Sequence, residues 1–596
     1  MIARFIVGTS ALAFAAAATV WGVHLGELGP IGDKATQRAL EVARARLEQR
    51  PSPPVFAGDA LQDGLPVIVS LFARGRVVAR GEGRGLTFGV ALDDAVTRLH
   101  SALTPETELA NGRLKLDRVI ARGYLVSSLL PLLALGTVPG RDGVGARSGG
   151  GREVYLTTDD LLLEGLWAAY RPLPAADFAI GMDGNKLVRV LDRALDGARR
   201  SSMFRFRAEE AIEGAHPRPT TPTKTEVEAG ARAAGGYLAR HLRDSGRFDY
   251  EYLASEEGAI EDSAYSLPRH AGATSFLAQS YALDHDPAIR AAAMKALDWL
   301  VVQRPVGCDG ARVCVGDPRA AQVDLGAAAL SLIAALELER TTGEARYPAF
   351  VRGLAEFVLF MQRPDGEFCH LFEPAKHLRD EKTSQLFYSG EAAYALALLV
   401  PRADPVLAER AKTALDRALH HLIDDAYSSF AMQFFMGEEH WTCMAVSAGW
   451  PHLPPSTREH YAEFCDQFAV FSRRVQMHAE EPMVRAQPQL AGAYGVSSVI
   501  AAAATPVGSR SEAMLSIWQL AKVRGIEDGD LRVTGPRAQL MEGLGYLLRH
   551  QISDDYLVRD LESARGGILL SEVERRVRID TVQHAGSAML RALPLL

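Results

Sequence analysis

The feature that most constrains this chain is a helical signature of small residues that recurs through its C-terminal two-thirds. Glycine and alanine gather beside larger apolar residues in strong copies that begin near residues 270, 324, 389, 491, 541 and 583, and in a weaker copy at Cys443. The repeat length is about 52 residues, which accommodates two helices and their loops. Residues 226–596 are therefore predicted to form repeated helix hairpins.

The small residues also predict how the hairpins are arranged. Helices that approach one another closely tolerate only small side chains at their crossings, which is typical of the inner helices of a closed ring. The intervening segments 288–302 and 347–361 show the amphipathic period of helices with one buried face. We expect a mainly α fold, an (α/α)6 toroid of six hairpins. An open solenoid is the alternative, but the chain lacks the polar capping repeats that a solenoid requires.

A different pattern occupies residues 61–214. The stretch GLPVIVSLFARGRVVARG, from Gly64 to Gly81, alternates β-branched and turn residues and predicts one or two strands. A helix is expected over residues 93–103, and GGREVYLTTDDLLLEGLW predicts a strand followed by a helix capped at Thr157 or Thr158. This region is predicted to be a smaller α+β domain. The Pro/Thr-rich segment 215–225 is expected to link it to the toroid.

The N-terminus predicts export. Residues 5–25 are apolar apart from Thr9, Ser10, Thr19 and His24, and Arg4 precedes them. Such a run is long enough to cross a bilayer as a helix, so residues 1–30 are expected to be an uncleaved signal-anchor. The positive-inside rule places the body in the periplasm or outside the cell, on a stalk formed by residues 31–60. Cleavage, which would release a secreted protein, is the alternative.

Charge and motifs exclude several classes of function. The net charge of −8 and the absence of a basic patch argue against nucleic acid as a partner. No glycine-rich phosphate loop, GxSxG elbow or HExxH motif occurs, so nucleotide binding and the α/β-hydrolase and zincin activities receive no support. Only five cysteines are present, of which Cys308 and Cys314 are close enough in sequence to form a disulfide in an exported protein.

The most concentrated group of reactive side chains lies in residues 246–272, just before the first small-residue helix. Alternation in FDYEYL places two acids on one side of an extended segment and two tyrosines on the other. Carboxylates for proton transfer beside aromatic faces are typical of sugar sites. Solvated acids and packing tyrosines are the alternative explanation. The candidates are Asp249, Tyr250, Glu251, Tyr252, Arg269 and His270.

Similar residues recur at later helix starts and hairpin ends: Glu367, His370, Tyr388, Glu391, Glu439, His440, Trp441, Asp580 and His584. Some of them have structural alternatives. Asp580 suits a helix N-cap, and Glu391 suits the positive end of a helix dipole. His584 and His270 share an HAG context, so both are also candidates for packing.

These residues and the repeat pattern resemble the six-hairpin superfamily of glycosidases and carbohydrate epimerases, over about 370 residues. The resemblance implies a glycan-acting site at the mouth formed by the inner-helix starts, with Asp249, Glu251, His270, Glu391 and Glu439 as catalytic candidates and the others binding substrate. GLPVIVSLFARGRVVARG and the later GRDGVGARSGGGREVYLTTDDLL resemble the AMMECR1-type domain, which names no activity.

The leading hypothesis is a membrane-tethered hydrolase, lyase or epimerase acting on an envelope glycan without a cofactor. Its rival is a non-catalytic toroid that binds a glycan or a protein partner. Zinc is the cofactor alternative, because Cys369, His370 and Cys443 offer soft ligands such as those of lanthionine cyclase-like toroids. Leu371 stands where that family's Cys-His-Gly signature requires glycine, so the two cysteines are expected to be buried apolar residues instead.

Overall fold

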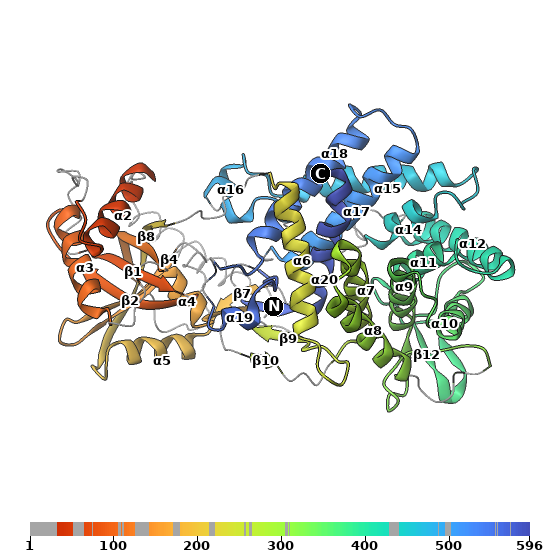
Figure 1. The fold of residues 1–596 in the computed structure, drawn as a ribbon, viewed down its shortest axis with the longest axis horizontal. Coiled ribbons are helices and arrows are strands. Elements are labelled where there is room, and N and C mark those ends of the chain that lie inside the picture. Colours follow the sequence, from red (N-terminus) through yellow and green to blue (C-terminus); the bar gives the residue numbers. More distant parts are fainter. Residues whose placement is uncertain are drawn as a thin grey trace, which may run out of the picture.

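The computed structural model describes residues 33–596 except for 52–64, 74, 105–108, 110–111, 125–141, 171–178, 214–220, 255–257, 261–264, 304–307, 309, 428–439, 487, 495–501, 555, 557 and 572–573. The predicted signal-anchor lies outside the described residues. In the part of the chain that is described, no helix is long and apolar enough to cross a membrane. A sheet domain and a larger helical domain follow one another along the molecule (Figure 1).

The N-terminal domain is built on a six-stranded antiparallel sheet. Its strand order is β2-β1-β3-β8-β4-β5, and a separate two-stranded hairpin pairs β6 with β7. The strands are β1 (Val67–Ala73), β2 (Arg76–Gly83), β3 (Arg113–Tyr124), β4 (Asp142–Ser148), β5 (Glu153–Leu156), β6 (Trp167–Tyr170), β7 (Ala179–Met182) and β8 (Arg200–Ile212). The helices α4 (Thr158–Leu163) and α5 (Gly184–Ala194) also belong to this domain. Thr157 caps α4 through a capping box with Asp160, so one of the two predicted caps is confirmed.

Two helices pack against this sheet: α3 (Phe88–Ala102) lies against β1 and β2, and α2 (Asp33–Leu47) lies against β3, β8 and α3. Residues 33–47 of the segment expected to be a stalk therefore belong to the domain core. Val42 and Ala43 of α2 are completely buried, in one cluster with Val67 and Leu71 of β1. The amphipathic face of α2 explains the difference, because an apolar stripe is stable only when another element covers it.

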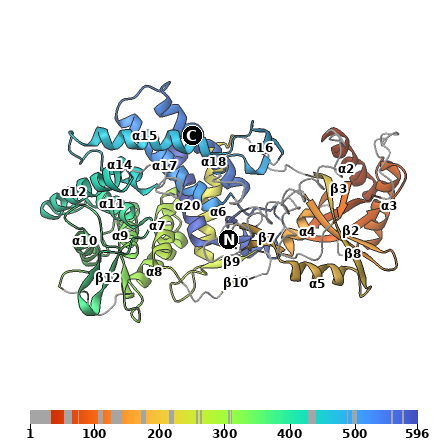
Figure 2. The ribbon, with the colours of Figure 1, turned by 180° about the vertical axis from the view of Figure 1, so that it is seen from behind.

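In the described part of the C-terminal domain there are twelve longer helices, and six of them make a closed inner ring. Each inner helix contacts the next one, and the last contacts the first. The inner helices are α7 (Leu267–Asp284), α9 (Leu325–Thr342), α11 (Tyr388–Leu399), α14 (Trp441–Gly449), α17 (Ala504–Val523) and α20 (Ile579–Ala592). The outer helices are α6 (Lys224–Arg240), α8 (Pro287–Val302), α10 (Pro348–Met361), α12 (Pro405–His420), α15 (Arg458–Val475) and α18 (Leu531–Arg549). The predicted six-hairpin toroid is confirmed by these contacts, and Figure 2 shows it from behind.

Short elements occupy the connections between the long helices. Two three-stranded sheets join segments that are distant in sequence, in the orders β10-β9-β14 and β11-β12-β13. Their strands are β9 (Glu251–Leu253), β10 (Gly258–Ile260), β11 (Val323–Asp324), β12 (Leu371–Glu373), β13 (Leu378–Asp380) and β14 (Arg576–Arg578). The remaining short helices are η3 (Pro374–Lys376), η4 (His421–Ala426), α16 (Pro482–Ala486), η5 (Pro488–Leu490), α19 (Leu561–Ala564) and η6 (Leu593–Leu595).

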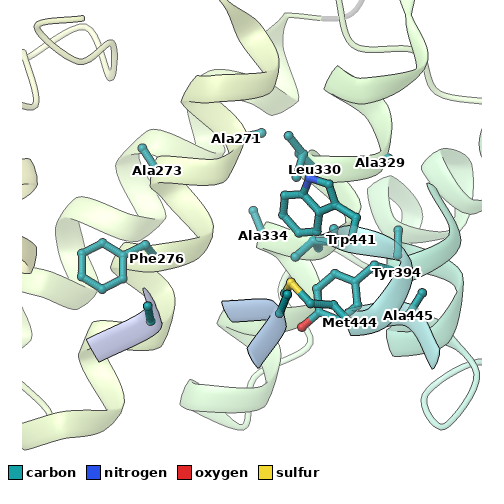
Figure 3. Packing of buried hydrophobic residues seen from close by; sticks show 14 of the residues in the cluster. Ala271, Ala273, Phe276, Ala329, Leu330, Ala334, Tyr394, Trp441, Met444 and Ala445 are labelled. Atoms are coloured by element: carbon teal, nitrogen blue, oxygen red, sulfur yellow. The ribbon is translucent and has the colours of Figure 1, made fainter. Parts of the chain in front are cut away.

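Small residues do allow the inner helices to approach one another. A Cβ atom at Gly586 of α20 would lie 2.1 Å from the ring of Phe276 on α7, and one at Gly326 of α9 would lie 2.4 Å from the ring of Tyr388 on α11. The alanines and larger apolar side chains around Phe276 and Trp441 interleave in the same way (Figure 3). The packing explanation of the signature is therefore correct.

The signature does not, however, distinguish inner from outer helices. The copy at residue 541 lies on the outer helix α18, where Gly543 packs against Ser511 of α17. Of the copy that begins at residue 491, the described residues 491–494 lie in a turn, and the inner helix of that hairpin begins at Ala504. Close approach occurs between inner and outer helices as well, so small residues mark any tight crossing.

A recurring loop follows several outer helices. The side-chain amides of Gln362, Gln476 and Gln551 each donate to a backbone carbonyl of the next outer helix in the ring, over 2.8 to 3.0 Å. A glycine with positive φ follows in each loop, namely Gly366, Gly492 and Gly566. At these three places the loop fastens one outer helix to the next.

Cysteine pairing is the last constraint on the fold. The structure pairs Cys308 with Cys314, and it also pairs Cys443 of α14 with Cys465 of α15. Cys443 is therefore not the unpaired apolar residue that the sequence suggested. Cys369 is buried and unbonded. The Cys443–Cys465 pair links the inner and outer helices of successive hairpins.

Both pairs are expected to be oxidised in the protein isolated from its native compartment. Peptide mapping without reductant should recover 308 with 314 and 443 with 465, each pair lighter by two hydrogens, whereas Cys369 should be alkylated after unfolding and serves as the internal control. Alkylation of Cys443 and Cys465 without reduction would contradict the pairing.

Candidate functional site

Polar side chains from all six inner helices gather in one region, at the starts of five of these helices and in the middle of α17 (Ala504–Val523). Three contact groups make up this arrangement, and each joins helices that are distant in sequence. The residues are Arg269, Asp324, Tyr388, Glu391, His440, Glu512, Asp580 and His584. We refer to them as the ring site.

The first group joins three helices through one carboxylate. Glu512 of α17 lies with its Oε2 atom 2.7 Å from Nδ1 of His584 on α20 and 3.9 Å from Nε2 of His440 at the start of α14. Glu512 and His440 are buried, whereas His584 is partly exposed. Burial raises the pKa of Glu512, but the hydrogen bond from His584 and the nearby charges of His584, His440 and Arg591 lower it overall. A buried anion thus lies between two imidazoles.

Aromatic side chains line the same part of the ring interior. The ring of Trp441 lies 4.5 Å from His440, 5.7 Å from Tyr394 and 6.0 Å from His584, measured between ring centroids. Figure 3 shows Trp441 and Tyr394 next to Met444. Arg591 lies 3.9 Å from Glu512 and also donates a hydrogen bond to the hydroxyl of Ser516. The two imidazoles therefore have an apolar wall beside them.

The second group joins α7 to α20. Nε of Arg269 lies 3.0 Å from Asp580, and the guanidinium also contacts the hydroxyl of Tyr250. Arg578 pairs with the same carboxylate over 2.5 and 2.9 Å. Although burial raises the pKa of Asp580, the charges of Arg578 and Arg269 lower it to about 2. Asp580 is thus a fixed anion in the first turn of α20, and the backbone N–H of Thr581 also donates to it.

The third group joins α9 to α11. Asp324 caps α9 by accepting from the backbone N–H of Ala327 over 2.6 Å, and it interacts with the hydroxyl of Tyr388. Burial raises the pKa of Asp324 to about 6. A Cβ atom at Gly326 would lie 2.8 Å from a carboxylate oxygen of Glu391, so the glycine lets this buried acid reach α9. Burial and the charges of Asp324 and Glu391 raise the pKa of Tyr388, whereas the charge of Arg269 lowers it.

His270 is not part of the ring site, which corrects its assignment as a catalytic candidate. Its Nδ1 accepts from the Tyr265 hydroxyl over 2.7 Å, and its Nε2 donates to the carbonyl of Ala296 over 3.0 Å. The imidazole is completely buried beside Phe248 and Trp299. Burial lowers the pKa of His270 to about 3, so the ring is a neutral packing residue between α7 and α8.

His270 should make the stability of the toroid depend on pH. Its folded pKa lies below the ordinary value of 6.5, so the unfolded chain binds the extra proton and stability falls as the pH drops below 6.5. The expected loss is about 1.4 kcal/mol per pH unit between pH 6.5 and pH 3. Urea unfolding at pH 7.5 and 5.5 measures it.

The variant His270→Gln provides the comparison for this pH effect. It should be less stable than the wild type at pH 7.5, yet it should lose about 1.4 kcal/mol less between the two pH values. His550, whose pKa burial lowers to about 4, remains in both proteins and keeps part of the slope. An unchanged slope in His270→Gln contradicts the neutral buried imidazole.

Glu367 and His370 lie behind the ring site rather than in it. The backbone N–H of Gln385 donates to Nδ1 of His370 over 2.5 Å, so Nε2–H donates to Ser389 over 2.7 Å. Ser389 in turn donates to Glu367, which also pairs with His421 over 2.9 Å. Both ring nitrogens of His370 therefore have hydrogen-bond partners. The Ser389 hydroxyl donates its hydrogen bond to a carboxylate and not to a histidine. This network is suited to fastening the hairpin and not to nucleophilic catalysis.

The acids of the 246–272 loop also lie elsewhere. Asp249 pairs with Arg243 and contacts His241, and Glu251 pairs with Arg576 across the β9–β14 ladder. The predicted alternation is confirmed, because Tyr250 and Tyr252 are buried while the two acids are only half-buried. Tyr252 packs against His241. Glu439, the remaining catalytic candidate, lies outside the described residues.

Sequence reasoning missed Glu512, Asp324 and Tyr394. The signal for Glu512 is the polar run SRSE within an otherwise apolar helix, since Ser509, Arg510, Ser511 and Glu512 are all buried. A buried charge inside a helix that is covered on all sides needs a partner from another element. Asp324 was visible only as a residue next to a small-residue helix.

A surface depression of about 640 Å³ lies on the outside of the toroid, against α8. It is lined by residues that include Arg290, Met294, Lys295 and Trp299, and by none of the ring-site residues. Its chemistry is that of an ordinary outer-helix surface. The ring site remains the better candidate, because it concentrates buried ionisable groups from many helices.

No protein-family model matches this sequence, and no curated protein matches it. The chain is similar to several solved structures. A sugar epimerase from a ruminal bacterium is 12% identical with a TM-score of 0.45, and the match covers 62% of this chain and 98% of that one. The cellobiose 2-epimerase of Spirochaeta thermophila is 12% identical with a TM-score of 0.43, covering 62% and 96%. The GH76A α-1,6-mannanase of Salegentibacter sp. is 13% identical with a TM-score of 0.40, covering 63% and 99%.

Likeness at this distance says nothing about the reaction. The toroid follows from the contacts between its own helices, and the chemistry has to be inferred from the ring site. The AMMECR1-type resemblance of the N-terminal domain stays a prediction.

Proposed function

We propose that this chain is an enzyme that moves a proton at a carbon atom of a sugar or of the reducing end of a glycan, as an epimerase or isomerase does, within the ring site. The observation that carries the proposal is the pair of imidazoles on Glu512, with His584 at 2.7 Å and His440 at 3.9 Å. Hydrolysis of a glycosidic bond uses two carboxylates instead.

The proposed chemistry uses His440 and His584 as acid and base. In an open-chain sugar, one imidazole takes the proton from the carbon next to the carbonyl group, and the electron pair moves onto the carbonyl oxygen. Return of a proton to the opposite face gives the epimer, and return to the neighbouring carbon gives the isomer. Imidazole is suited to both directions because its ordinary pKa lies near neutrality.

Other ring-site residues have supporting roles in this proposal. Glu512 accepts a hydrogen bond from the Nδ1–H group of His584 and so orients that imidazole ring. Trp441 and Tyr394 offer apolar faces for a sugar ring, and Arg269, whose side chain is 41% exposed, offers N–H donors for substrate oxygens. The mixture of aromatic faces, fixed charges and a few donors is typical of carbohydrate sites.

Hydrogen exchange with solvent tests the proposal. The full chain is incubated in D2O with a panel of reducing mono- and oligosaccharides, and each sugar is examined by NMR. Deuterium should enter one sugar at the carbon next to the carbonyl group as its epimer or isomer forms. Binding without exchange or product would favour the rival, a non-catalytic toroid that binds a glycan or a protein.

Export and membrane tethering are part of the same proposal. They are supported by the apolar run 5–25 behind Arg4. The two cysteine pairs are also suited to an oxidising compartment. A glycan of the cell envelope is the substrate that such a location would offer.

A further inference from the structure

The first group of the ring site also has the composition of a metal centre. His440, Glu512 and His584 each offer one ligand atom, and the three atoms lie within 4.8 Å of one another. They come from α14, α17 and α20, which are successive inner helices held in contact. Two imidazoles and one carboxylate form a donor set that Zn²⁺ takes in proteins, with a further position left open.

The distances fit an ion of that size. Zinc binds nitrogen and oxygen at about 2.0–2.1 Å, so tetrahedral ligand atoms lie about 3.3–3.4 Å apart. The two distances from Oε2 of Glu512, 2.7 Å to His584 and 3.9 Å to His440, lie on either side of that value. Side-chain shifts of about half an ångström would equalise them, with no change in the helices.

The surroundings support a bound cation as well. Glu512 is a buried carboxylate, although Arg591, 3.9 Å from its Oε1 atom, offsets part of its charge. Asp580 adds negative charge close to His584, although Arg578 and Arg269 neutralise it in part. The walls formed by Trp441 and Tyr394 keep the local dielectric constant low, which strengthens the attraction between the ion and Glu512.

We propose that His440, Glu512 and His584 bind one divalent transition-metal ion of the zinc type. Nitrogen donors select such ions over Mg²⁺ and Ca²⁺, which require oxygen ligands. Binding replaces the hydrogen bond between His584 and Glu512 with two metal–ligand bonds: the proton leaves Nδ1 of His584, whose lone pair then binds the ion, and the neutral imidazole carries its one proton on Nε2. The site differs from the zinc alternative suggested by the sequence, because Cys443 is bonded to Cys465 and neither Cys369 nor His370 takes part.

Metal binding is independent of the proposed reaction. An ion on Nδ1 of His584 leaves the proton of that ring on Nε2, where no lone pair then remains for a substrate proton, so a loaded site and an acid–base site are mutually exclusive states of the same residues. A chain that binds zinc without acting on any sugar would still contain the metal centre. A chain that epimerises a sugar without binding zinc would contain only the acid–base site.

Titration of the full-length, tag-free chain with Zn²⁺ tests the proposal. Calorimetry should show one ion per chain, and both Glu512→Gln and His584→Gln should weaken binding by about 10²-fold or more. His478→Gln is the matched control. It removes a histidine that lies 2.7 Å from Glu542 by the same kind of contact, in a pair that belongs to no three-ligand group among the described residues. Its affinity for zinc should be unchanged.

A spectroscopic measurement keeps the test independent of how the variants fold. Co²⁺ added to the wild-type chain should give the intense visible absorption of a four-coordinate nitrogen and oxygen site, and Zn²⁺ should remove it. The absence of a one-to-one site for either ion overturns the proposal. So does zinc binding that survives unchanged in both folded variants.

Discussion

Replacing His584 by Gln is expected to lower turnover of the sugar by about 10² to 10⁴-fold, which is the usual contribution of a general acid or base. Gln keeps a hydrogen-bond donor for Glu512 but cannot take a proton from carbon. The imidazole is only 12% exposed and faces Glu512, so the loss should appear in kcat more than in KM. Steady-state kinetics on the sugar found by hydrogen exchange measures it.

Two other variants distinguish catalysis from a loss of folding. His478→Gln, at the His–Glu pair outside the ring site, should retain wild-type turnover. His270→Gln should lose stability while each folded molecule remains active, because His270 packs between α7 and α8, away from the ring site. Circular dichroism of every variant gives the folded fraction. Full activity of folded His584→Gln would exclude the imidazole as acid or base.

Replacing Gly492 by Ala is expected to destabilise the toroid by about 3 kcal/mol or more. Its φ is +85°, where L-residues are disfavoured, and a Cβ atom there would lie 2.0 Å from the carbonyl oxygen of Glu542. That carbonyl belongs to the backbone of α18, so relief requires a helix to move. Thermal unfolding should show a clear fall in Tm.

Gly343 supplies the control for the glycine effect. It has a similar φ of +73° at the end of α9, but a Cβ atom there would have no neighbour within 4 Å. Gly343→Ala should therefore cost only about 1–2 kcal/mol, the price of the left-handed conformation. Equal losses in the two variants would mean that the contact between the recurring loop and the next outer helix contributes nothing.

The sequence predicted the ring because close helix packing leaves a local trace. Small residues at a crossing, such as Gly326 and Gly586, are visible without knowledge of their partners. The same trace did not separate inner from outer helices, since Gly543 packs just as closely on the outer helix α18. Local composition indicates that another helix packs closely at that position, but it does not indicate which helix.

The candidate site was predicted in part. Arg269, Tyr388, Glu391, His440, Trp441, Asp580 and His584 do come together with other residues at the inner-helix starts. Their convergence follows from the topology, because inner helices of a toroid run in the same direction and begin at the same end. Glu512 was missed because it lies in the middle of α17, away from any predicted helix start.

The two HAG segments show most clearly what the sequence could not decide. His270 and His584 each precede Ala-Gly at an inner-helix start, yet His270 is held by Tyr265 and Ala296 on the outer side whereas His584 meets Glu512. Their local sequences predict the same helix and the same small-residue packing. The rotation of each helix about its own axis decides which side chains face the ring interior, and that rotation is set by contacts with helices hundreds of residues away. The sequence by itself therefore determined that helices pack closely and in what order, and the tertiary structure alone decided which histidine meets the buried carboxylate.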